Sequence, residues 1–456
     1  MFNRILVANR GEIAVRVIRA CRELGISTVA VYSQADRESL HVRMADEAIC
    51  IGPAKSADSY LNIARIISAA EVADVDAIHP GYGFLSENAH FATICRDSGI
   101  TFIGPSPETM TLLGHKIRAR KLAGEAGAPV LPGSDGPVED DAEALKIARR
   151  IGYPVMVKAA AGGGGRGIRL AHNDLTLSNG LLSARTEAAA SFKDGSVYIE
   201  KRIERPRHVE VQILGDLQGN LIHLGERDCS TQRRHQKLLE ETPSPVLDPE
   251  QRTALCEAAL KVGRAARYAN AGTVEFLLDP STGKFYFMEV NTRLQVEHPV
   301  TEAVTGVDLV RSQIRIAAGE SLSSLKLPAG PPSGAAIECR INVEDPAHNF
   351  RACPGRITTF IPPGGPHVRV DTHGYTGYTV PPHYDSLLAK VIVHGKDRTE
   401  ALAVLARALR EFVVEGVATT LPFHRGLLED ERFLAGKVDT GFVEREFLAR
   451  ETGGMA

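Results

Sequence analysis

The chain has 456 residues, of which 43% are hydrophobic and 24% are charged. Domains commonly hold about 100–200 residues, so this length indicates about two to four domains with hydrophobic cores and excludes a disordered chain. The 53 basic and 56 acidic residues give a net charge of −3, which argues against a protein that coats nucleic acid. No apolar run reaches the roughly 18 residues of a membrane span, and no signal or transit peptide precedes the first apolar segment. We therefore expect a cytoplasmic protein that binds neither nucleic acid nor membranes.

The seven cysteines are odd in number and form no Cys-x-x-Cys pair, so neither a disulfide framework nor a structural zinc site is expected. Most should be reduced and buried. Cys229 differs because it lies in a polar, arginine-rich stretch. A nucleophilic cysteine needs a base beside it, and the sequence identifies none, so we do not expect Cys229 to act in catalysis.

The first 105 residues alternate between strand-like and helical patterns. From Gly11 to Leu24, for example, apolar residues recur at helical spacing, and Gly25 ends the segment. This alternation predicts a parallel sheet with helices on both faces and ligands beyond the carboxyl ends of its strands, at residues 9–11 and 81–83. The predicted strands are 4–8, 28–32, 76–79 and 100–103, and the predicted helices are 11–24, 60–70 and 87–98.

Two further units follow along the chain. A small α+β unit is predicted for about residues 130–203, with strands at 154–158, 168–170 and 196–200 and a helix at 173–190. The third unit begins near residue 204, with predicted strands at 208–214, 220–225, 272–278 and 284–290 and a helix at 249–268. The last two strands are predicted to pair around the turn at 280–283. Beyond a Pro- and Gly-rich linker at 327–333, segments 336–343, 356–360 and 388–393 predict a further sheet, followed by a helix at 398–412.

A glycine-rich loop follows the strand that ends in Lys158. Residues 162–165 are four consecutive glycines, followed by Arg166 and Gly167. Backbone N–H groups of such a loop can approach a polyphosphate closely, and Lys158 could add a positive charge. The loop lacks the Gly-Lys-Ser/Thr ending of a Walker A motif, and its strand–loop–strand context suggests a flap over phosphates. A flexible surface hairpin is the alternative.

Acidic residues on two predicted strands indicate a metal site. Glu289 and Asn291 are two residues apart on one strand and so share a face, and Glu275 joins them if the two strands pair. Two carboxylates and an amide oxygen suit Mg²⁺ held together with nucleotide phosphates. A solvated strand face is the alternative, but the apolar neighbours make uncompensated carboxylates costly here, which favours the metal.

Two charged stretches flank this predicted site. Arg293 and Glu297 follow directly and are close enough to meet at one small anionic substrate, although a structural ion pair is the alternative. The stretch 226–237 is rich in charged and polar residues. By itself such a run is typical of a solvated face or surface loop, but next to phosphates its donors become electrostatic clamps.

These residues together resemble an ATP-grasp enzyme, and more narrowly the biotin carboxylase component of biotin-dependent carboxylases, most like that of acetyl-CoA carboxylase. The most specific stretches are HPGYGFLSEN at 79–88, ERDCSTQRRHQK at 226–237 and EVNTRLQVEH at 289–298. The resemblance covers essentially the whole chain. It implies an α/β and α+β fold with an N-terminal parallel-sheet domain at 1–113, an ATP-grasp region at 114–330 with a mobile lid at about 130–203, and a mixed-sheet C-terminal domain at 331–446.

The resemblance also assigns expected roles to matching positions. Lys116 and Lys158 would hold ATP phosphates, and Gly164 and Gly165 would cover them. The other positions that match ATP contacts are the adenine hinge Glu200, Lys201 and Ile203, then His208, Gln232 and His235. The matching metal ligands, which reach ATP through Mg²⁺ or Mn²⁺, are Glu275, Glu289 and Asn291. The bicarbonate cradle matches Lys237, Arg293, Gln295 and Val296, the general base matches Glu297, and the biotin-ring site matches Arg340 and Tyr82.

The implied reaction is the first half-reaction of an acyl-CoA carboxylase: ATP phosphorylates bicarbonate to carboxyphosphate, which decays to CO₂ in a water-poor pocket, and biotin is then carboxylated. Glu297, Arg293, Arg340 and Lys237 would be catalytic, with Arg340 stabilising charge on the ureido oxygen and the released phosphate as the expected base. The chain carries no biotinylation-like Ala-Met-Lys-Met sequence, so a separate biotin carboxyl carrier protein and carboxyltransferase subunits are expected. Family members of this length are usually homodimers.

Two features limit these expectations. Ala160 and Ala161 precede only four glycines, whereas the family's glycine run is often longer, so flap mobility or phosphate affinity could differ. The acyl acceptor stays open among acetyl-CoA, propionyl-CoA and pyruvate. The alternative functions are an ATP-grasp ligase that joins a carboxylate to an amine, which has no need of Arg340, and a nucleotide-sensing module without turnover, which has no need of Glu275, Glu289, Arg293 and Glu297 together.

Overall fold

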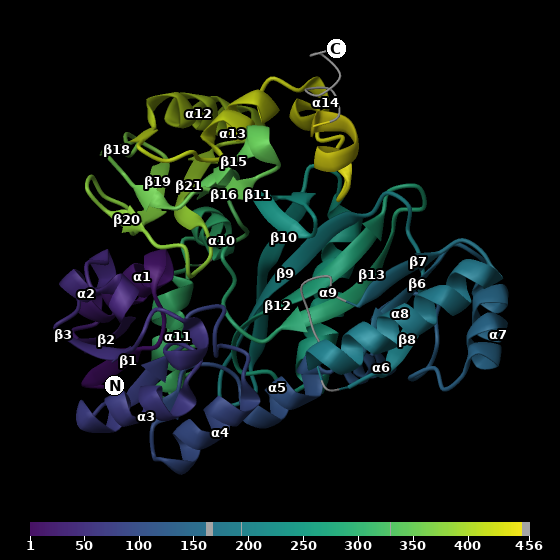
Figure 1. The fold of residues 1–456 in the computed structure, drawn as a ribbon, viewed down its shortest axis with the longest axis horizontal. Coiled ribbons are helices and arrows are strands. Elements are labelled where there is room, and N and C mark those ends of the chain that lie inside the picture. The colour runs from purple at the N-terminus through teal and green to yellow at the C-terminus, as the bar shows by residue number, and fades with distance from the viewer. Residues whose placement is uncertain (161–166, 193, 329, 449–456) are drawn as a thin grey trace.

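The structure is a computed structural model that describes residues 1–160, 167–192, 194–328 and 330–448. A long twisted sheet forms the middle of the molecule (Figure 1). The N-terminal and C-terminal units lie on one side of it, and a small unit projects on the other. Gly164 and Gly165, which the resemblance assigns to the phosphate cover, lie outside the described residues. No helix among the described residues has the length and apolar character needed to cross a membrane.

The N-terminal unit has the predicted parallel sheet, in the order β3-β2-β1-β4-β5. Asn62 and Asn88 cap two of its helices by accepting backbone N–H bonds. Its strands are β1 (Arg4–Val7), β2 (Ser27–Ser33), β3 (Glu47–Gly52), β4 (Ala77–His79) and β5 (Thr101–Phe102), and its helices are α1 (Gly11–Glu23), α2 (Leu40–Met44), α3 (Ile63–Val72) and α4 (Ala89–Asp97), with short 3₁₀ turns at Gln34–Asp36 and Ser56–Asp58. The sequence patterns do not predict α2 or β3, because α2 has five residues and β3 is a largely exposed edge strand.

A small antiparallel sheet forms the projecting unit, in the order β7-β6-β8. Alternating residues of β6, including Val155 and Val157, are buried against Leu177 and Leu181 of the long helix. The unit consists of α7 (Asp141–Ile151), β6 (Val155–Ala159), β7 (Ile168–Ala171), α8 (Asp174–Phe192) and β8 (Val197–Lys201), and it follows α5 (Pro107–Gly114) and α6 (Lys116–Glu125). The three strands and the long helix were predicted, and α5, α6 and α7 were not.

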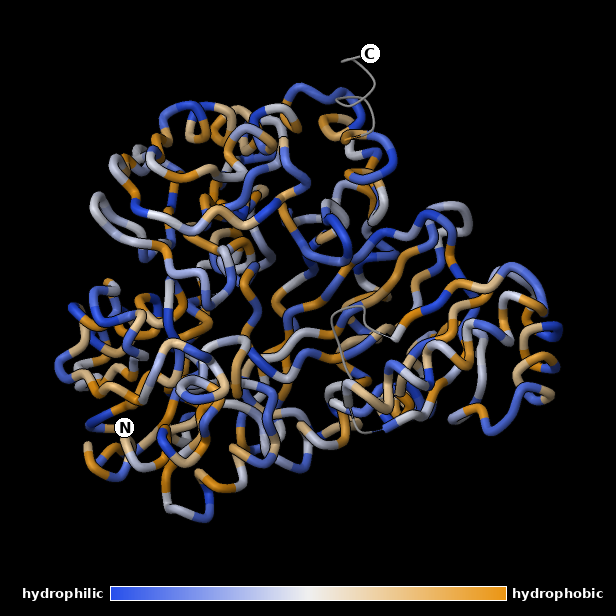
Figure 2. The backbone as a smooth tube through the Cα atoms, viewed as in Figure 1, coloured by the Kyte–Doolittle hydropathy of each residue, from blue (hydrophilic) through white to orange (hydrophobic). Residues whose placement is uncertain are grey.

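The central sheet has, within the described residues, the order β13-β12-β9-β10-β11-β14-β21-β19. Its members are β9 (Arg207–Gly215), β10 (Leu221–Arg233), β11 (Gln236–Thr242), β12 (Asn270–Asp279), β13 (Lys284–Asn291), β14 (Ala335–Asn342), β19 (Val368–Thr372) and β21 (Leu387–Gly395). The predicted pairing of segments 272–278 and 284–290 is confirmed. Figure 2 shows hydrophilic residues interrupting the hydrophobic stretches along these central strands, which is unusual for a buried sheet and marks where charged groups enter the interior.

The C-terminal unit corrects one prediction. Segments 336–343 and 388–393 are strands, but they extend the central sheet instead of forming a further one. The connection is β11, which pairs with β10 on one side and β14 on the other. The sequence does not predict β11 because five of its seven residues are polar or charged and only Leu238 and Leu239 are hydrophobic. Segment 356–360 is also not one strand but is divided between β17 (Gly355–Arg356) and β18 (Thr359–Ile361).

Helices cover the central sheet and complete the chain. Helix α12, predicted at 398–412, packs Leu405 and Leu409 on strands β14 and β21. The remaining helices are α9 (Pro249–Ala265), α10 (His298–Thr305), α11 (Leu309–Ala317), α12 (Arg398–Glu411), α13 (Leu421–Leu427), α14 (Glu431–Leu434), a 3₁₀ turn at Pro346–His348 and a π-helical turn at Val443–Phe447. The remaining strands are β15 (Glu344–Asp345), β16 (Arg351–Ala352), β20 (Thr379–Val380) and β22 (Val413–Glu415).

Candidate active site

Lys237 of β11 lies at the centre of a buried cluster of carboxylates. Its Nζ atom is 2.6 Å from Glu210, 3.0 Å from Glu275 and 2.6 Å from Glu297. Burial by itself would lower the pKa of Lys237, but the three surrounding carboxylates outweigh it and raise that pKa well above its usual value. The ammonium group therefore stays charged and holds three acidic side chains from different elements around one point.

A β-bulge determines which side chains of β11 face this cluster. Thr231 of β10 pairs with Leu239, whereas the next residue, Gln232, pairs with Lys237, so Leu238 is an extra residue in the strand. Lys237 and Glu240, three positions apart, therefore face the same side, which regular alternation would not allow. Lys237 donates directly to Glu297. Glu240 is connected to Glu297 through Arg340, which donates to both carboxylates.

Glu297 connects the cluster to the C-terminal unit. Its Oε1 atom accepts from Lys237, and its Oε2 atom accepts from Nη2 of Arg340 at 2.9 Å. Burial favours the neutral acid, but Lys237, Arg340 and Arg227 together hold the pKa of Glu297 well below its usual range. Glu297 is therefore an ionised carboxylate that can accept a proton. Residues 297 and 340, which the resemblance assigns to the general base and to the biotin-ring site, are thus in direct contact.

The predicted metal ligands lie on one sheet face. Glu275 and Glu289 are direct cross-strand partners, and Asn291 is opposite Thr273, two residues from Glu275. Oε1 of Glu275 accepts from the Asn291 amide at 2.8 Å, and Glu289 forms an ion pair with Lys116 at 3.2 Å. Two carboxylates and an amide oxygen at this separation form a donor set that suits a hard divalent cation. His208, Glu210 and Glu275 also lie close enough to share an ion, but the Lys237 ammonium occupies the same cluster.

His208 reinforces the charge balance of Glu275. Its Nε2 atom is 3.2 Å from Glu275, and this carboxylate raises the pKa of the imidazole despite the burial that would lower it. The pKa of Glu275 is correspondingly held well below its usual value, since Lys237 and His208 outweigh the effect of burial. Glu275 therefore remains anionic, as a cation ligand must.

The predicted bicarbonate residues surround Glu275 and Glu297, although not all face them. Gln295 donates to Glu275 and accepts from Arg227, each at 2.8 Å. Arg293 donates to Glu87 at 2.9 Å and to Asn291 at 3.1 Å. The backbone carbonyl of Val296 accepts from Lys390 at 2.8 Å. Arg293 is thus held by Glu87, a residue of the 79–88 motif, instead of pairing with Glu297.

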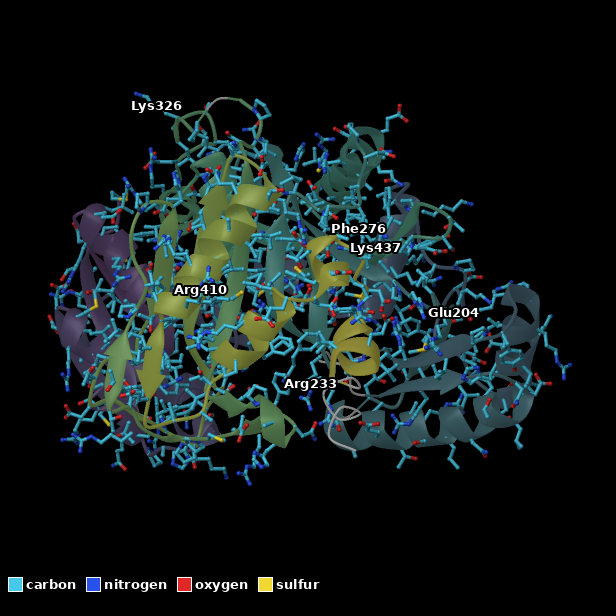
Figure 3. The ribbon with its side chains drawn as sticks, turned by 90° about the horizontal axis from the view of Figure 1, so that it is seen from above. Glu204, Arg233, Phe276, Lys326, Arg410 and Lys437 are labelled. Atoms are coloured by element: carbon cyan, nitrogen blue, oxygen red, sulfur yellow. The ribbon has the colours of Figure 1, made fainter. Side chains whose placement is uncertain are left out.

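The predicted nucleotide residues lie around the small unit and the central hairpin. Glu200 accepts from Lys158 at 2.7 Å and pairs with Arg120 at 3.3 Å, whereas the Lys201 ammonium donates to the carbonyls of Gly152 and Tyr153. Gln232 is buried near the end of β10, and His235 lies in the turn before β11. Ile203 is partly buried just beyond β8. In Figure 3, Glu204 marks the chain directly after this hinge and Arg233 marks the end of β10.

Tyr82 lies apart from Arg340 in this structure. Its hydroxyl donates to Glu12, and its ring centroid is 6.0 Å from Lys390 Nζ. Among the described residues no hydrogen bond joins Tyr82 and Arg340, but the Arg340 charge acts on Tyr82: burial and Glu12 raise the pKa of Tyr82, and Arg340 opposes them. Tyr82 also lines a cavity of about 350 Å³ with Phe84, Tyr384 and Asp385.

The charged run 226–237 is not the solvated loop that such a run suggests by itself. Residues 226–233 are buried in β10. Arg227 bonds Glu210, Gln212, Thr273, Gln295 and Thr301, and Asp228 pairs with Arg207 at 2.7 Å. Cys229 is fully buried, and burial raises the pKa of its thiol well above the usual value, which agrees with the expectation that it is not a nucleophile.

Sequence reasoning missed several residues of this site. They are Glu12, Glu87, Arg120, Glu210, Arg227, Glu240 and Lys390. Arg227 and Glu87 lie inside the quoted motifs, which was a usable indication. Glu12 in α1, Glu210 in β9 and Lys390 in β21 are isolated charges among hydrophobic residues, and such a charge implies a buried partner. Arg120 of α6 and Glu240 of β11 lie in charged segments, where no such signal exists.

The chain matches known protein families along most of its length. The description "Biotin carboxylase, N-terminal domain" matches residues 1–110, "Carbamoyl-phosphate synthase L chain, ATP binding domain" matches 115–325, and "Biotin carboxylase C-terminal domain" matches 338–445. The chain is 57% identical over 444 residues to "Biotin carboxylase 1" of Bacillus subtilis, which covers 97% of this chain and 98% of that protein.

The fold is also similar to solved biotin carboxylase structures. A biotin carboxylase complex with β,γ-ATP from Campylobacter jejuni superposes with a TM-score of 0.94 at 49% identity, covering 98% of this chain and 99% of that one. The biotin carboxylase domain dimer of the 2-oxoglutarate carboxylase from Hydrogenobacter thermophilus, in complex with MgADP, ADP and bicarbonate, has a TM-score of 0.92 at 49% identity and covers 97% of each chain.

Proposed function

The chain belongs to the biotin carboxylase family of ATP-grasp ligases, and we propose on that basis that the cluster around Lys237, Glu297 and Arg340 carries out its reaction. The enzyme is an ATP-dependent ligase that uses ATP and bicarbonate to carboxylate biotin. The observation that carries the assignment of residues is that Glu297 accepts from Lys237 and Arg340 at once. This pair of contacts supports the proposal that one ionised carboxylate lies between the bicarbonate site and the biotin site.

The nucleotide would lie between the small unit and the central sheet. Lys116 and Lys158 are the proposed phosphate contacts, together with Gly164 and Gly165, and each lysine now pairs with a carboxylate that ATP could replace. Glu200, Lys201 and Ile203 would contact adenine, with His208, Gln232 and His235 completing the site. Glu275, Glu289 and Asn291 would hold Mg²⁺ or Mn²⁺, which neutralises phosphate charge during phosphoryl transfer.

Bicarbonate would bind among Lys237, Arg293, Gln295 and the backbone of Val296. A bicarbonate oxygen attacks the γ-phosphorus of ATP, ADP leaves, and Glu297 takes the bicarbonate proton, which yields carboxyphosphate. Lys237 and Arg340 now lower the pKa of Glu297. When these cations turn to bound anions, the carboxylate loses part of that stabilisation, and its basicity rises at the point where it must accept a proton.

Biotin would bind beside Arg340, with Tyr82 at the edge of its site. Carboxyphosphate breaks into CO₂ and phosphate, and the phosphate removes the proton from the ureido nitrogen that attacks CO₂. Charge then develops on the ureido oxygen, where a guanidinium stabilises it. Arg340 is held by Glu240 and Glu297, so the guanidinium is positioned before the charge appears.

The assembly around this enzyme is also proposed from the family. The chain would act on biotin attached to a separate carrier protein and pass carboxybiotin to carboxyltransferase subunits. A homodimer is proposed because the Hydrogenobacter domain is described as a dimer. The acceptor can be acetyl-CoA or another acyl compound, since the same fold serves a 2-oxoglutarate carboxylase. The functional division proposed is residues 1–113, 114–330 and 331–446.

The test is ADP formation by the purified chain with Mg²⁺. We expect cleavage of ATP to require bicarbonate and to rise when free biotin is added. ADP release that does not change when bicarbonate is removed would contradict the proposal. An amine-joining ligase would instead require an amine and would tolerate loss of Arg340.

A further inference from the structure

Two carboxyl groups oppose each other behind Arg340. Glu240 of β11 and Glu338 of β14 are direct cross-strand partners, and both side chains are 0% exposed. Cross-strand partners of this kind have Cβ atoms about 5 Å apart. Oε2 of Glu240 and both oxygens of Glu338 have no hydrogen-bond partner among the described residues. Two ionised carboxylates at this distance in a dry interior would repel each other strongly.

The groups that face each member of the pair differ. Glu240 faces Arg340, Lys237 and Glu297, and its Oε1 atom accepts from Arg340 Nε at 2.6 Å. Glu338 faces Lys390, Glu240, Arg340 and Glu297, but none of them bonds to it. The Lys390 ammonium is already used by Glu12 at 3.1 Å and by the Val296 carbonyl. Glu240 therefore has a cation of its own, and Glu338 has none.

The surroundings of Glu338 are also apolar. Ala336 lies two positions before Glu338 on β14, and Ile392 is its direct partner on β21. Val300 and Val304 of helix α10 pack on these two residues. An ionised carboxylate in such a place loses its hydration without gaining a donor, so the neutral acid is favoured. Burial accordingly raises the pKa of Glu338 well above its usual value, and Glu240 adds to the shift while Lys390 opposes it.

We propose that Glu240 and Glu338 hold a single proton, carried by Glu338 and shared with the free oxygen of Glu240, and that this pair is the positioning device of Arg340. The proposal rests on the function assigned above and adds two residues to it. Arg340 donates through Nε to Glu240, and its Nη2 atom contacts both Glu240 and Glu297. Its Nη1 atom has no hydrogen-bond partner among the described residues and remains for a substrate oxygen. Glu338 makes no hydrogen bond to Arg340, and in this proposal it positions Arg340 through Glu240.

Comparison of two Glu338 variants distinguishes the proposed positioning role of Glu338 from a role in packing alone. Glu338→Gln keeps a neutral hydrogen-bond donor toward Glu240, whereas Glu338→Leu has similar volume and no donor. We expect Glu338→Leu to lower kcat for biotin-stimulated ATP cleavage about 100-fold and to leave the KM for ATP unchanged. The reason is that displacing a catalytic group such as the Arg340 guanidinium by about 1 Å commonly lowers the rate by that factor. Glu338→Gln should restore most of the rate. Equal losses in both variants, or no loss in either, would overturn the proposal.

A matched control is Glu241, the neighbour of Glu240 on β11. Glu241 is also buried but pairs with Arg398 of α12 instead of Arg340. Glu241→Gln should cost stability without changing kcat for biotin-stimulated cleavage. If it lowers that kcat as Glu338→Leu does, general loosening of the sheet explains the effect and the positioning role is wrong.

The proton itself can be observed without turnover. The infrared difference spectrum between the wild-type chain and Glu338→Gln at neutral pH should contain the carbonyl band of one protonated carboxyl group. A spectrum that contains only carboxylate bands contradicts the shared proton. A wild-type chain without biotin-stimulated ATP cleavage would instead refute the proposed function and leave the infrared result to decide the state of the pair.

Discussion

Arg340 of β14 and Glu297, directly before helix α10, are 43 residues apart in the chain. Their side chains are in contact, with Nη2 of Arg340 2.9 Å from Oε2 of Glu297. Each is also held from behind, Glu297 by Lys237 and Arg340 by Glu240. The chain of four charges crosses from the centre of the sheet to β14. It joins the site proposed to activate bicarbonate to the site proposed to receive biotin, so changes at one end should be measurable at the other.

The Arg340 guanidinium should matter for biotin more than for ATP. In Arg340→Gln we expect kcat/KM for free biotin to fall about 100-fold, the usual cost of removing one donor from a developing oxyanion. The affinity for ATP, measured by calorimetry, should stay within about twofold of wild type because Arg340 is not a proposed nucleotide contact.

The matched control is Arg398→Gln, which removes the ion pair between Arg398 and Glu241, the neighbour of Glu240 on β11. It should lower stability and leave kcat/KM for biotin unchanged. Biotin carboxylation that persists in Arg340→Gln would show that the site has been assigned to the wrong arginine.

Lys237 should be a determinant of stability as well as of catalysis. In Lys237→Met, Glu210, Glu275 and Glu297 lose their shared cation. Removing one partner of a buried ionic cluster commonly costs about 3–5 kcal/mol, and we expect the free energy of unfolding in urea to fall by that amount. Lys437→Met, at an exposed lysine, should change it by less than about 0.5 kcal/mol. Equal stability of the two variants would mean that the cluster is solvated.

Buried histidines should make the fold sensitive to acid. Burial lowers the pKa of His41 and His424 to about 4, and of His79 and His373 to about 3, from 6.5. Between pH 6.5 and about 4 each of these four histidines therefore binds more protons in the unfolded chain than in the folded one, so the stability that they contribute is lost as pH falls through this window. Each histidine contributes up to about 1.4 kcal/mol per pH unit.

The measurement is urea unfolding at pH 7.0, 6.0 and 5.0. The free energy of unfolding should decrease over this range, and His79→Gln should reduce the slope. A slope in His79→Gln equal to that of the wild type would contradict the neutral buried state of this ring.

The metal site should depend on both carboxylates. Glu289→Gln removes one proposed ligand from the partly exposed side of the site, and Glu275→Gln removes the buried one. We expect Mn²⁺ binding in the presence of ADP, followed by electron paramagnetic resonance, to weaken by at least about tenfold in each variant. Binding equal to wild type in Glu289→Gln would exclude that residue as a ligand. Glu320→Gln, distant and paired with Arg315, is the control.

Much of the fold could be predicted because hydrophobic periodicity expresses local structure. The alternation in residues 4–103 predicted the parallel sheet, and the turn at 280–283 predicted the pairing of β12 with β13. The central sheet was harder. Strand β11 begins with Gln236 and Lys237 and ends with Glu240, Glu241 and Thr242, a composition typical of a loop. It is a strand because Arg340, Arg398 and three carboxylates compensate its charges, and these partners are distant in sequence.

The site residues that lie in contiguous motifs could be predicted from the sequence. Those whose position depends on a β-bulge or on a strand distant in sequence could not. Spacing placed Glu289 and Asn291 on one face correctly. Regular alternation would instead separate Lys237 from Glu240, and only the extra residue Leu238 brings them together. Arg293 illustrates a second limit. Its nearness to Glu297 in sequence suggested a pair, but Glu87 of another unit binds it.

The most direct measurement is transfer of labelled carbon from bicarbonate to free biotin by this chain alone, with ATP and Mg²⁺. The wild-type chain should form labelled carboxybiotin only when ATP and bicarbonate are both present. Glu297→Gln should form it about 100 to 10,000 times more slowly, as expected for loss of a general base. Unchanged labelling in Glu297→Gln, or ATP cleavage by the wild type without any labelled biotin, would contradict the account.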